Sequence, residues 1–168
     1  MMRLFVFLSV SILLTILLSC GEKLTEQQLR ALAIEYENKE MHEEEIEVYE
    51  KLVKQFPNSG RLDEDLYKLG VKYANNLKDF KKSVECYTKL VENFPESDYR
   101  PQSKFMIGYR YANDIKDLEK AKKNYEEFLE MYPDHELASS VKWELEHLGK
   151  DISEIDLELG SGDSLVTQ

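Results

Sequence analysis

The sequence predicts an all-α fold, a short superhelix of three helix pairs with a capping helix at the C-terminal end of the stack. The first observation is the composition, which is rich in helix formers and contains only 7 Gly and 4 Pro among 168 residues. The second is a period: Pro57, Pro95 and Pro133 lie 38 residues apart, and each follows Phe or Tyr. The third is that apolar residues recur at helical spacing between these prolines. A constant period of this length indicates a repeat architecture.

Each repeated unit carries two amphipathic patterns separated by a polar turn. In the middle unit the two apolar faces are formed by Leu66, Leu69, Gly70 and Tyr73, then by Val84, Tyr87, Leu90 and Val91. Proline ends each second helix, because it lacks the N–H of the helical hydrogen bond and its ring clashes with the preceding turn. Thr25 and Gln28 form a T-x-x-Q capping box at the start of the first helix. The units are expected at about 25–60, 61–98 and 99–135, with a capping helix at 136–149.

The N-terminal residues are expected to be a separate segment. Residues 1–19 are typical of a lipoprotein signal peptide, since the apolar run from Leu4 to Ser19 is short for a membrane span. The stretch "LLSC", residues 17–20, resembles the bacterial lipobox, which implies cleavage before Cys20 and lipidation (palmitate) of that cysteine. Residues 20–24 then form a short tether that keeps the domain close to its membrane. A plain cleaved signal peptide and an uncleaved anchor are the alternatives.

The lipobox resemblance also implies a location. Gly21 and Glu22 follow Cys20, and the aspartate that retains some lipoproteins in the inner membrane is missing there. The expected location is the bacterial cell envelope, lipid-anchored, at the periplasmic face of the outer membrane. At the other end, residues 150–168 are acidic and rich in Gly and Ser, and they are expected to be mostly disordered.

The repeated pattern resembles the tetratricopeptide repeat. The resemblance is carried by a small residue followed three positions later by tyrosine, by an aromatic residue in the second helix, and by the Phe/Tyr-Pro pair that ends it. The basic repeat has 34 residues. Three of the four extra residues follow each proline, and one lies in the inner turn of the second and third units. The resemblance implies a right-handed superhelix over residues 25–149.

The lengthened repeats, with "FPNSG", "FPESDY" and "YPDHEL" at the unit junctions, are similar to those of two bacterial envelope families. One is the outer-membrane assembly lipoprotein that supports barrel insertion, and the other is the Tol-Pal coordinator of cell division. The first implies a membrane-anchored scaffold for protein–protein contacts in outer-membrane protein assembly, although that family usually has about five repeats. The second implies a periplasmic coordinator of cell-wall or division machinery, although its coiled coil has no room between Cys20 and Thr25.

The tetratricopeptide resemblance implies which first-helix positions face a partner-binding groove. These are Arg30, Ile34 and Asn38, then Tyr67, Val71 and Asn75, then Phe105, Tyr109 and Asn113, and in the cap Trp143 and His147. Tyr67, Phe105 and Trp143 lie 38 residues apart and form a predicted aromatic ladder. Two interpretations of this ladder stay open. It packs between neighbouring units as core, or it anchors an extended or helical peptide whose backbone the asparagines bind.

Other function classes are disfavoured. A net charge of −11 argues against nucleic acid, because phosphate binding needs clustered Lys and Arg. An enzyme is not expected, since Glu144-x-x-His147 supplies only half of a di-iron motif and no phosphate loop or Ser/His/Asp set can be assembled. No cofactor, metal or small-molecule substrate is expected, and the partners are proteins or peptides of the envelope. Cys86 is expected to be a small buried hydrophobe, and the acids at 43, 44, 45 and 47 a solvated helix start.

Overall fold

The structure is a computed structural model that describes residues 23–150, and all regular secondary structure in this part of the chain is helical. The first pair is α2 (Glu26–Asn38) and α3 (His42–Gln55). The second is α4 (Leu62–Lys72), continued by the π-helical turn η1 (Tyr73–Leu77), and α5 (Phe80–Asn93). The third is α6 (Arg100–Arg110), continued by η2 (Tyr111–Ile115), and α7 (Leu118–Met131), and α8 (Ala138–Glu146) follows. The predicted all-α stack of three helix pairs and a capping helix is confirmed.

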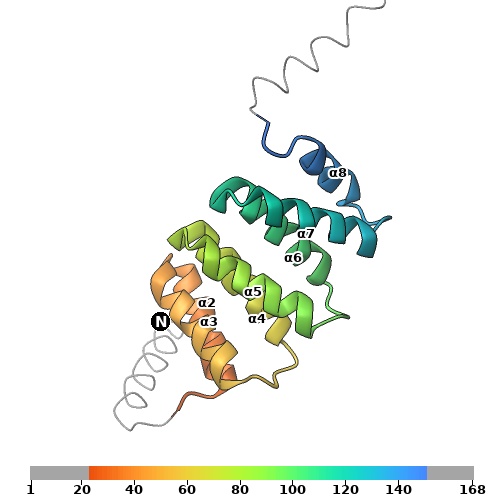
Figure 1. Cartoon of the computed structure of the whole chain (residues 1–168). Helices are drawn as coiled ribbons and strands as arrows, with labels where there is room; N and C mark the ends of the chain where they lie inside the picture. Colours follow the sequence, from red (N-terminus) through yellow and green to blue (C-terminus); the bar gives the residue numbers. More distant parts are fainter. Residues whose placement is uncertain (1–22, 151–168) are drawn as a thin grey trace, which may run out of the picture.

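The helices stack in chain order, so that each one packs mainly on the helices before and after it. In Figure 1 the second helices α3, α5 and α7 form the near layer, the first helices α2, α4 and α6 lie behind them, and α8 closes one end. Within residues 23–150, no helix is both long and apolar enough to cross a membrane. The expectations for the signal peptide, for Cys20 and for residues 151–168 concern residues outside this described part.

Local sequence signals explain where the helices begin and end. The capping box at α2 is confirmed: the backbone N–H of Gln28 donates to Thr25 Oγ1 over 3.3 Å, and the Thr25 N–H donates to Gln28 Oε1 over 2.9 Å. Asp79 and Asp117 cap α5 and α7 by accepting a backbone N–H, each over 3.1 Å. The three second helices end at residues 55, 93 and 131, each two residues before its proline.

The extra residue of the inner turn is taken up in a π-helical turn. In the second unit, η1 holds the extra residue: Tyr73 and the left-handed Lys78, with φ of 55°, are five positions apart, whereas Tyr36 and the left-handed Glu40 of the first unit are four apart. The N–H of the next residue, Asp79, then bonds back to the Tyr73 carbonyl over 2.9 Å. The third unit repeats this geometry with η2 and Lys116. In the first unit, which lacks the extra residue, α2 ends at Asn38 without a π-helical turn.

Two glycines allow the helices of a pair to approach closely. A Cβ added at Gly108 in α6 would lie 2.6 Å from Cε1 of Tyr125 in α7, and one at Gly70 in α4 would lie 2.7 Å from Cε1 of Tyr87 in α5. Both tyrosines are completely buried. The residue of α8 that corresponds in the repeat to Gly70 and Gly108 is Glu146, and its side chain is exposed. Another helix could not pack on α8 in this way, and α8 therefore suits the end of a stack.

Charged side chains tie the first unit to the second. The guanidinium of Arg30 in α2 bonds both carboxylate oxygens of Asp65 in α4, over 2.7 and 2.8 Å, and Asp65 is 1% exposed. Glu45, at the start of α3, is also 1% exposed, and its Oε1 lies 2.7 Å from Nζ of Lys72 in α4. The expectation that every acid of this run is solvated is wrong for Glu45, because the neighbouring unit covers that position.

Candidate functional site

The predicted groove residues are distributed along the first helices. Four of those in the three helix pairs are exposed: Ile34, which is 58% exposed, and Asn38 in α2, Asn75 in η1 and Asn113 in η2. Val71 in α4 and Tyr109 in α6 are half-buried. The spacing of the repeat thus brings a mixed apolar and amide surface to the first-helix side of the stack.

Arg30 is held by neighbouring side chains. Besides the two bonds to Asp65, its guanidinium donates to Glu26 over 2.8 Å and to the Ser59 hydroxyl over 3.3 Å. Ser59 in turn donates to the same Glu26 oxygen over 2.7 Å. These contacts, with the bond to Asp65 as the first cause, raise the pKa of Arg30 above its ordinary value. The bonds to Asp65 cross the junction between the first two units, while those to Glu26 and Ser59 stay within the first unit.

The three positions of the aromatic ladder have different environments. Tyr67 stacks on Tyr99 of the loop before α6, with ring centroids 4.9 Å apart and an interplanar angle of 24°, so it bridges the second and third units. It also lies 6.0 Å from the buried ring of Tyr87. Phe105 lies 6.2 Å from the buried ring of Tyr125. Tyr67 and Phe105 are therefore half-buried against the cores of their own units.

Trp143, the third position of the ladder, is on the surface. It lies in α8 and is 48% exposed. Its indole stacks on the His147 ring with centroids 4.4 Å apart and an interplanar angle of 23°. The Nδ1 of His147 lies 2.7 Å from the Trp143 carbonyl oxygen, which can only accept a hydrogen bond. The bond therefore places a proton on Nδ1, and in the neutral ring it leaves Nε2 as an acceptor.

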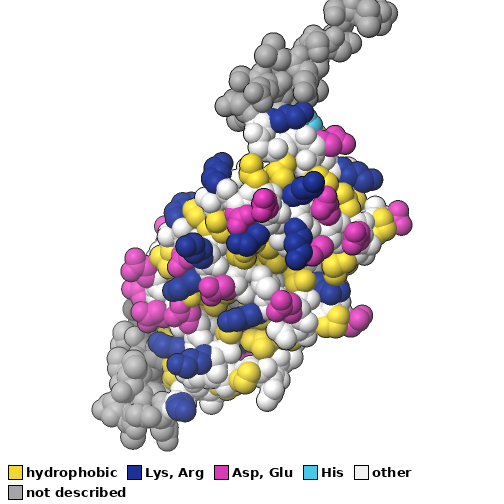
Figure 2. Space-filling model, in the orientation of Figure 1, with side chains coloured by type: hydrophobic (Ala, Val, Ile, Leu, Met, Phe, Trp, Pro, Cys, Tyr) yellow, Lys and Arg dark blue, Asp and Glu magenta, His cyan; other side chains and the backbone are white. Residues whose placement is uncertain are grey.

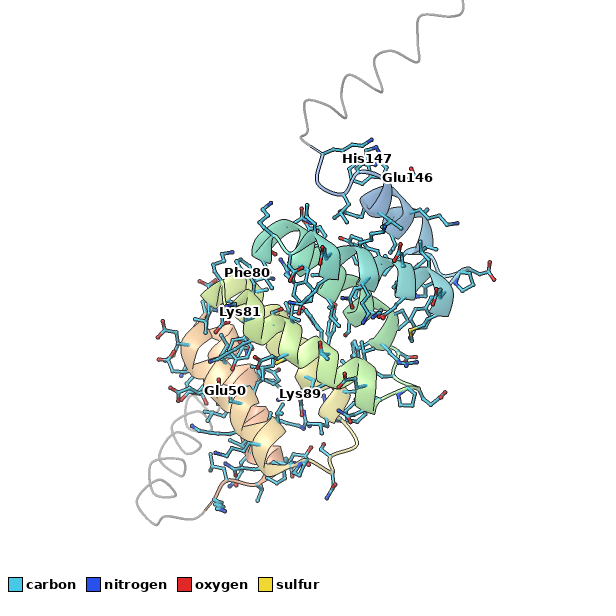
Figure 3. All side chains as sticks on the ribbon, viewed as in Figure 1. Glu50, Phe80, Lys81, Lys89, Glu146 and His147 are labelled. Carbon is cyan, nitrogen blue, oxygen red and sulfur yellow. The ribbon has the colours of Figure 1, made fainter. Side chains whose placement is uncertain are left out.

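A pocket of about 460 Å³ lies beside this stacked pair, between α8 and the end of the third first helix. Four of the predicted groove residues line it: Tyr109, Asn113, Trp143 and His147. The lining also includes Lys116, Leu118 and Glu144. Figure 3 labels His147 at the C-terminal end of α8. The remaining predicted groove residues belong to the first-helix face outside this pocket.

Glu144 also lines this pocket, although it was not among the groove residues that the sequence predicted. Burial raises the pKa of the Glu144 carboxyl above its ordinary value, partly offset by hydrogen bonds that favour the charged form. The hydroxyl of Tyr125 lies 3.5 Å from Glu144 Oε2, and burial raises the pKa of that tyrosine. In the described residues no group of His, Cys, Asp and Glu is arranged to hold a metal ion. The pocket offers aromatic surface, one amide, one partly buried carboxyl and two lysine side chains, Lys116 and Lys150.

Comparison with protein-family models gives matches over all three helix pairs. Models described as tetratricopeptide repeat match residues 31–59, 66–97 and 101–135. These segments cover more than half of the chain and fall on α2–α3, α4–α5 and α6–α7. No curated protein gave a match to the chain.

Proposed function

We propose that this chain, which belongs to the tetratricopeptide repeat family, acts as a membrane-anchored scaffold for protein–protein interaction in the bacterial envelope. Tetratricopeptide repeats support binding to protein partners and are typically non-enzymatic scaffolds. The envelope location rests on the lipobox-like residues that end at Cys20 and on the lengthened 38-residue repeat. Outer-membrane protein assembly is the first candidate process.

The observation that carries the proposed binding mode is the exposed Trp143 at the edge of the α8 pocket. Monomeric proteins usually bury most of a tryptophan, whereas this indole is 48% exposed beside a pocket of about 460 Å³. Tryptophan is enriched among the residues that contribute most to binding energy. We infer that a partner segment inserts an apolar side chain beside Trp143, while Asn113 binds its backbone. The exposed Ile34 extends the same face toward the first unit.

Replacing Trp143 with alanine tests this binding mode. We expect loss of a specific partner in a pull-down from crosslinked native membranes, with a loss in affinity of about 2 kcal/mol or more for the purified pair. Trp143 is a sharper target than Tyr67 or Phe105, because those rings pack against buried tyrosines and their loss would disturb the fold.

The matched control is Met131→Ala, which removes an apolar side chain of similar exposure, 40%, from the second-helix face. This variant should keep the partner. Equal capture by wild type and the Trp143 variant would place binding elsewhere. The identity of the lost partner would choose between outer-membrane protein assembly and the alternative, a periplasmic coordinator of cell-wall or division machinery.

The proposed anchor is tested at the two cysteines of the chain. Metabolic labelling with an alkyne-bearing palmitate should mark the wild type, and Cys20→Ser should abolish the label. Cys86→Ala is the control and should keep the label, because Cys86 is 7% exposed in α5 and burial raises the pKa of its thiol to about 12. If the Cys20 variant kept the label, the proposed lipid anchor at Cys20 would be contradicted.

A further inference from the structure

Two grooves with the same construction lie on the opposite side of the stack, between neighbouring second helices. The first separates α3 from α5 and the second separates α5 from α7, with volumes of about 220 and 550 Å³. Their linings correspond residue by residue after a shift of 38 positions: Leu66 becomes Lys104, Glu85 becomes Lys123, and Cys86 becomes Asn124. Figure 3 labels Glu50 and Lys89, which lie on the two helices that wall the first groove.

The two grooves differ in charge. Two acidic and two basic residues line the α3–α5 groove. The α5–α7 groove has two acidic residues and four basic ones, Arg100, Lys104, Lys120 and Lys123. Figure 2 shows this face with Lys and Arg side chains across its middle, among Asp and Glu side chains. A groove with a surplus of positive charge is notable in a chain whose net charge is −11.

Two of these cations are fixed at the bottom and end of the groove. Lys104 is 6% exposed, at the position where the preceding units have the core leucines Leu29 and Leu66, and it bonds Asn124 over 2.9 Å and pairs with Glu127. The guanidinium of Arg100 donates to two uncharged acceptors, the carbonyls of Val91 and Pro95, over 3.0 and 3.4 Å. These bonds hold Arg100 in place without neutralising it.

The apolar part of the α5–α7 groove is also open to solvent. Val91 and Tyr111 are half-buried in its lining, and Met131 at its far end is 40% exposed. The groove therefore presents an apolar strip with basic side chains along it, which suits a segment that carries aliphatic residues on one side and acids on the other.

Residues 151–168 of the same chain have this composition. They contain five acids and no Lys or Arg. From Glu154 to Leu159 the sequence "EIDLEL" alternates strictly, so an extended backbone places the three acids on one side and Ile155, Leu157 and Leu159 on the other. Six extended residues span about 20 Å, and a helix of the length of α7 spans about 20 Å as well.

The described structure ends close to the N-terminal end of α7, the helix that forms one wall of the groove. Gly149 lies against the first residue of α7, since a Cβ built on it would be 3.0 Å from Leu118 Cδ1. Lys120, which lines the groove, is two residues further along that helix and therefore on its other side. The four residues between Gly149 and Glu154 reach more than 10 Å when extended, about the diameter of a helix, so the chain can pass around the end of α7.

We propose that the α5–α7 groove is a docking site for an acidic, aliphatic segment in extended form, and that residues 151–168 of the same chain occupy it. The aliphatic side chains lie on Val91, Tyr111 and Met131, and the acids face Lys120, Lys123 and Arg100. Docked in this way, the segment closes the second-helix face to other acidic partners and leaves the first-helix face with Trp143 open.

Site-specific photocrosslinking in the full chain tests this proposal. With p-benzoylphenylalanine in place of Leu157, irradiation and mass spectrometry should find crosslinks to the groove, above all to Met131 and Tyr111. The double variant Lys120→Glu/Lys123→Glu should lower the yield about tenfold, because two attractive charges become repulsive. The same yield should fall as salt is raised.

Lys122→Glu is the control for the charge change. Lys122 lies on the same helix with its side chain 62% exposed but does not line the groove, so this variant should keep the wild-type yield. The side chains of Lys120 and Lys123 are 60% and 75% exposed, so their reversal leaves the core intact, which circular dichroism will verify. Crosslinks to Tyr109 or Trp143 instead, or crosslinks between light and heavy copies in an isotope mixture, would overturn docking within one chain.

Discussion

Arg30→Met is expected to lower the free energy of unfolding by about 3–5 kcal/mol, because it leaves the Asp65 carboxylate buried without its partner. The Asp65 side chain is 2% exposed and bonds the guanidinium through both oxygens. Methionine keeps the aliphatic part of the Arg30 side chain, so the loss reports mainly on the charge. Urea unfolding followed by circular dichroism measures it.

A double replacement measures the contribution of the Arg30–Asp65 ion pair apart from the cost of leaving one of its charges buried alone. Arg30→Met/Asp65→Leu removes both charges and should recover most of the lost stability, since apolar side chains can replace a buried ion pair at little cost. Lys39→Met breaks the exposed pair with Glu35, whose side chains are 54% and 42% exposed, and should change stability by less than about 1 kcal/mol. If Arg30→Met were as mild as Lys39→Met, the junction between the first two units would not depend on Arg30.

Gly108→Ala is the second large effect and is expected to destabilise the chain by about 1–3 kcal/mol through overpacking. The added Cβ would lie 2.6 and 2.7 Å from two atoms of the completely buried Tyr125 ring, so the ring or the helix would have to shift. In an exposed helix the same change would stabilise by up to about 1 kcal/mol, because alanine has the higher helix propensity. The sign of the measured change therefore decides whether close approach of α6 and α7 is the reason for this glycine.

Gly60→Ala is the matched control, since a Cβ at Gly60 meets no atom within 4 Å, and it should be close to neutral. The first unit offers a structural comparison. It has Ala33 and Tyr49 at the corresponding positions, and Tyr49 is 6% exposed where Tyr87 and Tyr125 are fully buried. A Gly108 variant as stable as wild type would mean that the third unit can adopt the looser arrangement of the first.

Many features of the fold were predictable from the sequence because they depend on residues close together in the chain. The prolines end α3, α5 and α7 through a local clash, and the Thr25–Gln28 capping box acts within one helical turn. Burial of Cys86 followed from its apolar helix face and is confirmed. The sequence predicted that the extra residue lies in the inner turn, but it did not predict that this turn is π-helical. Tyr73 and Tyr111 begin the two π-helical turns, whereas the corresponding Tyr36 of the first unit lies in an ordinary α-helix.

The candidate site was predictable only in part. The repeat spacing gives Tyr67, Phe105 and Trp143 the same place in each unit. Their different surroundings depend on what the next unit supplies: Tyr99 stacks on Tyr67, while α8 leaves Trp143 half exposed. Sequence spacing cannot distinguish these cases, because exposure is set by residues 20 or more positions away.

The sequence by itself therefore determined the number of helix pairs, their order and their ends, all of which follow from local backbone preferences and a 38-residue period. The tertiary structure decided the roles of the charged residues. Arg30 bonds a carboxylate 35 residues away, Glu45 is covered by Lys72, and Lys104 replaces a core leucine above Glu127. The physical reason is that the cost of burying a charge depends on the partner that packing brings to it, and packing joins residues of different helices.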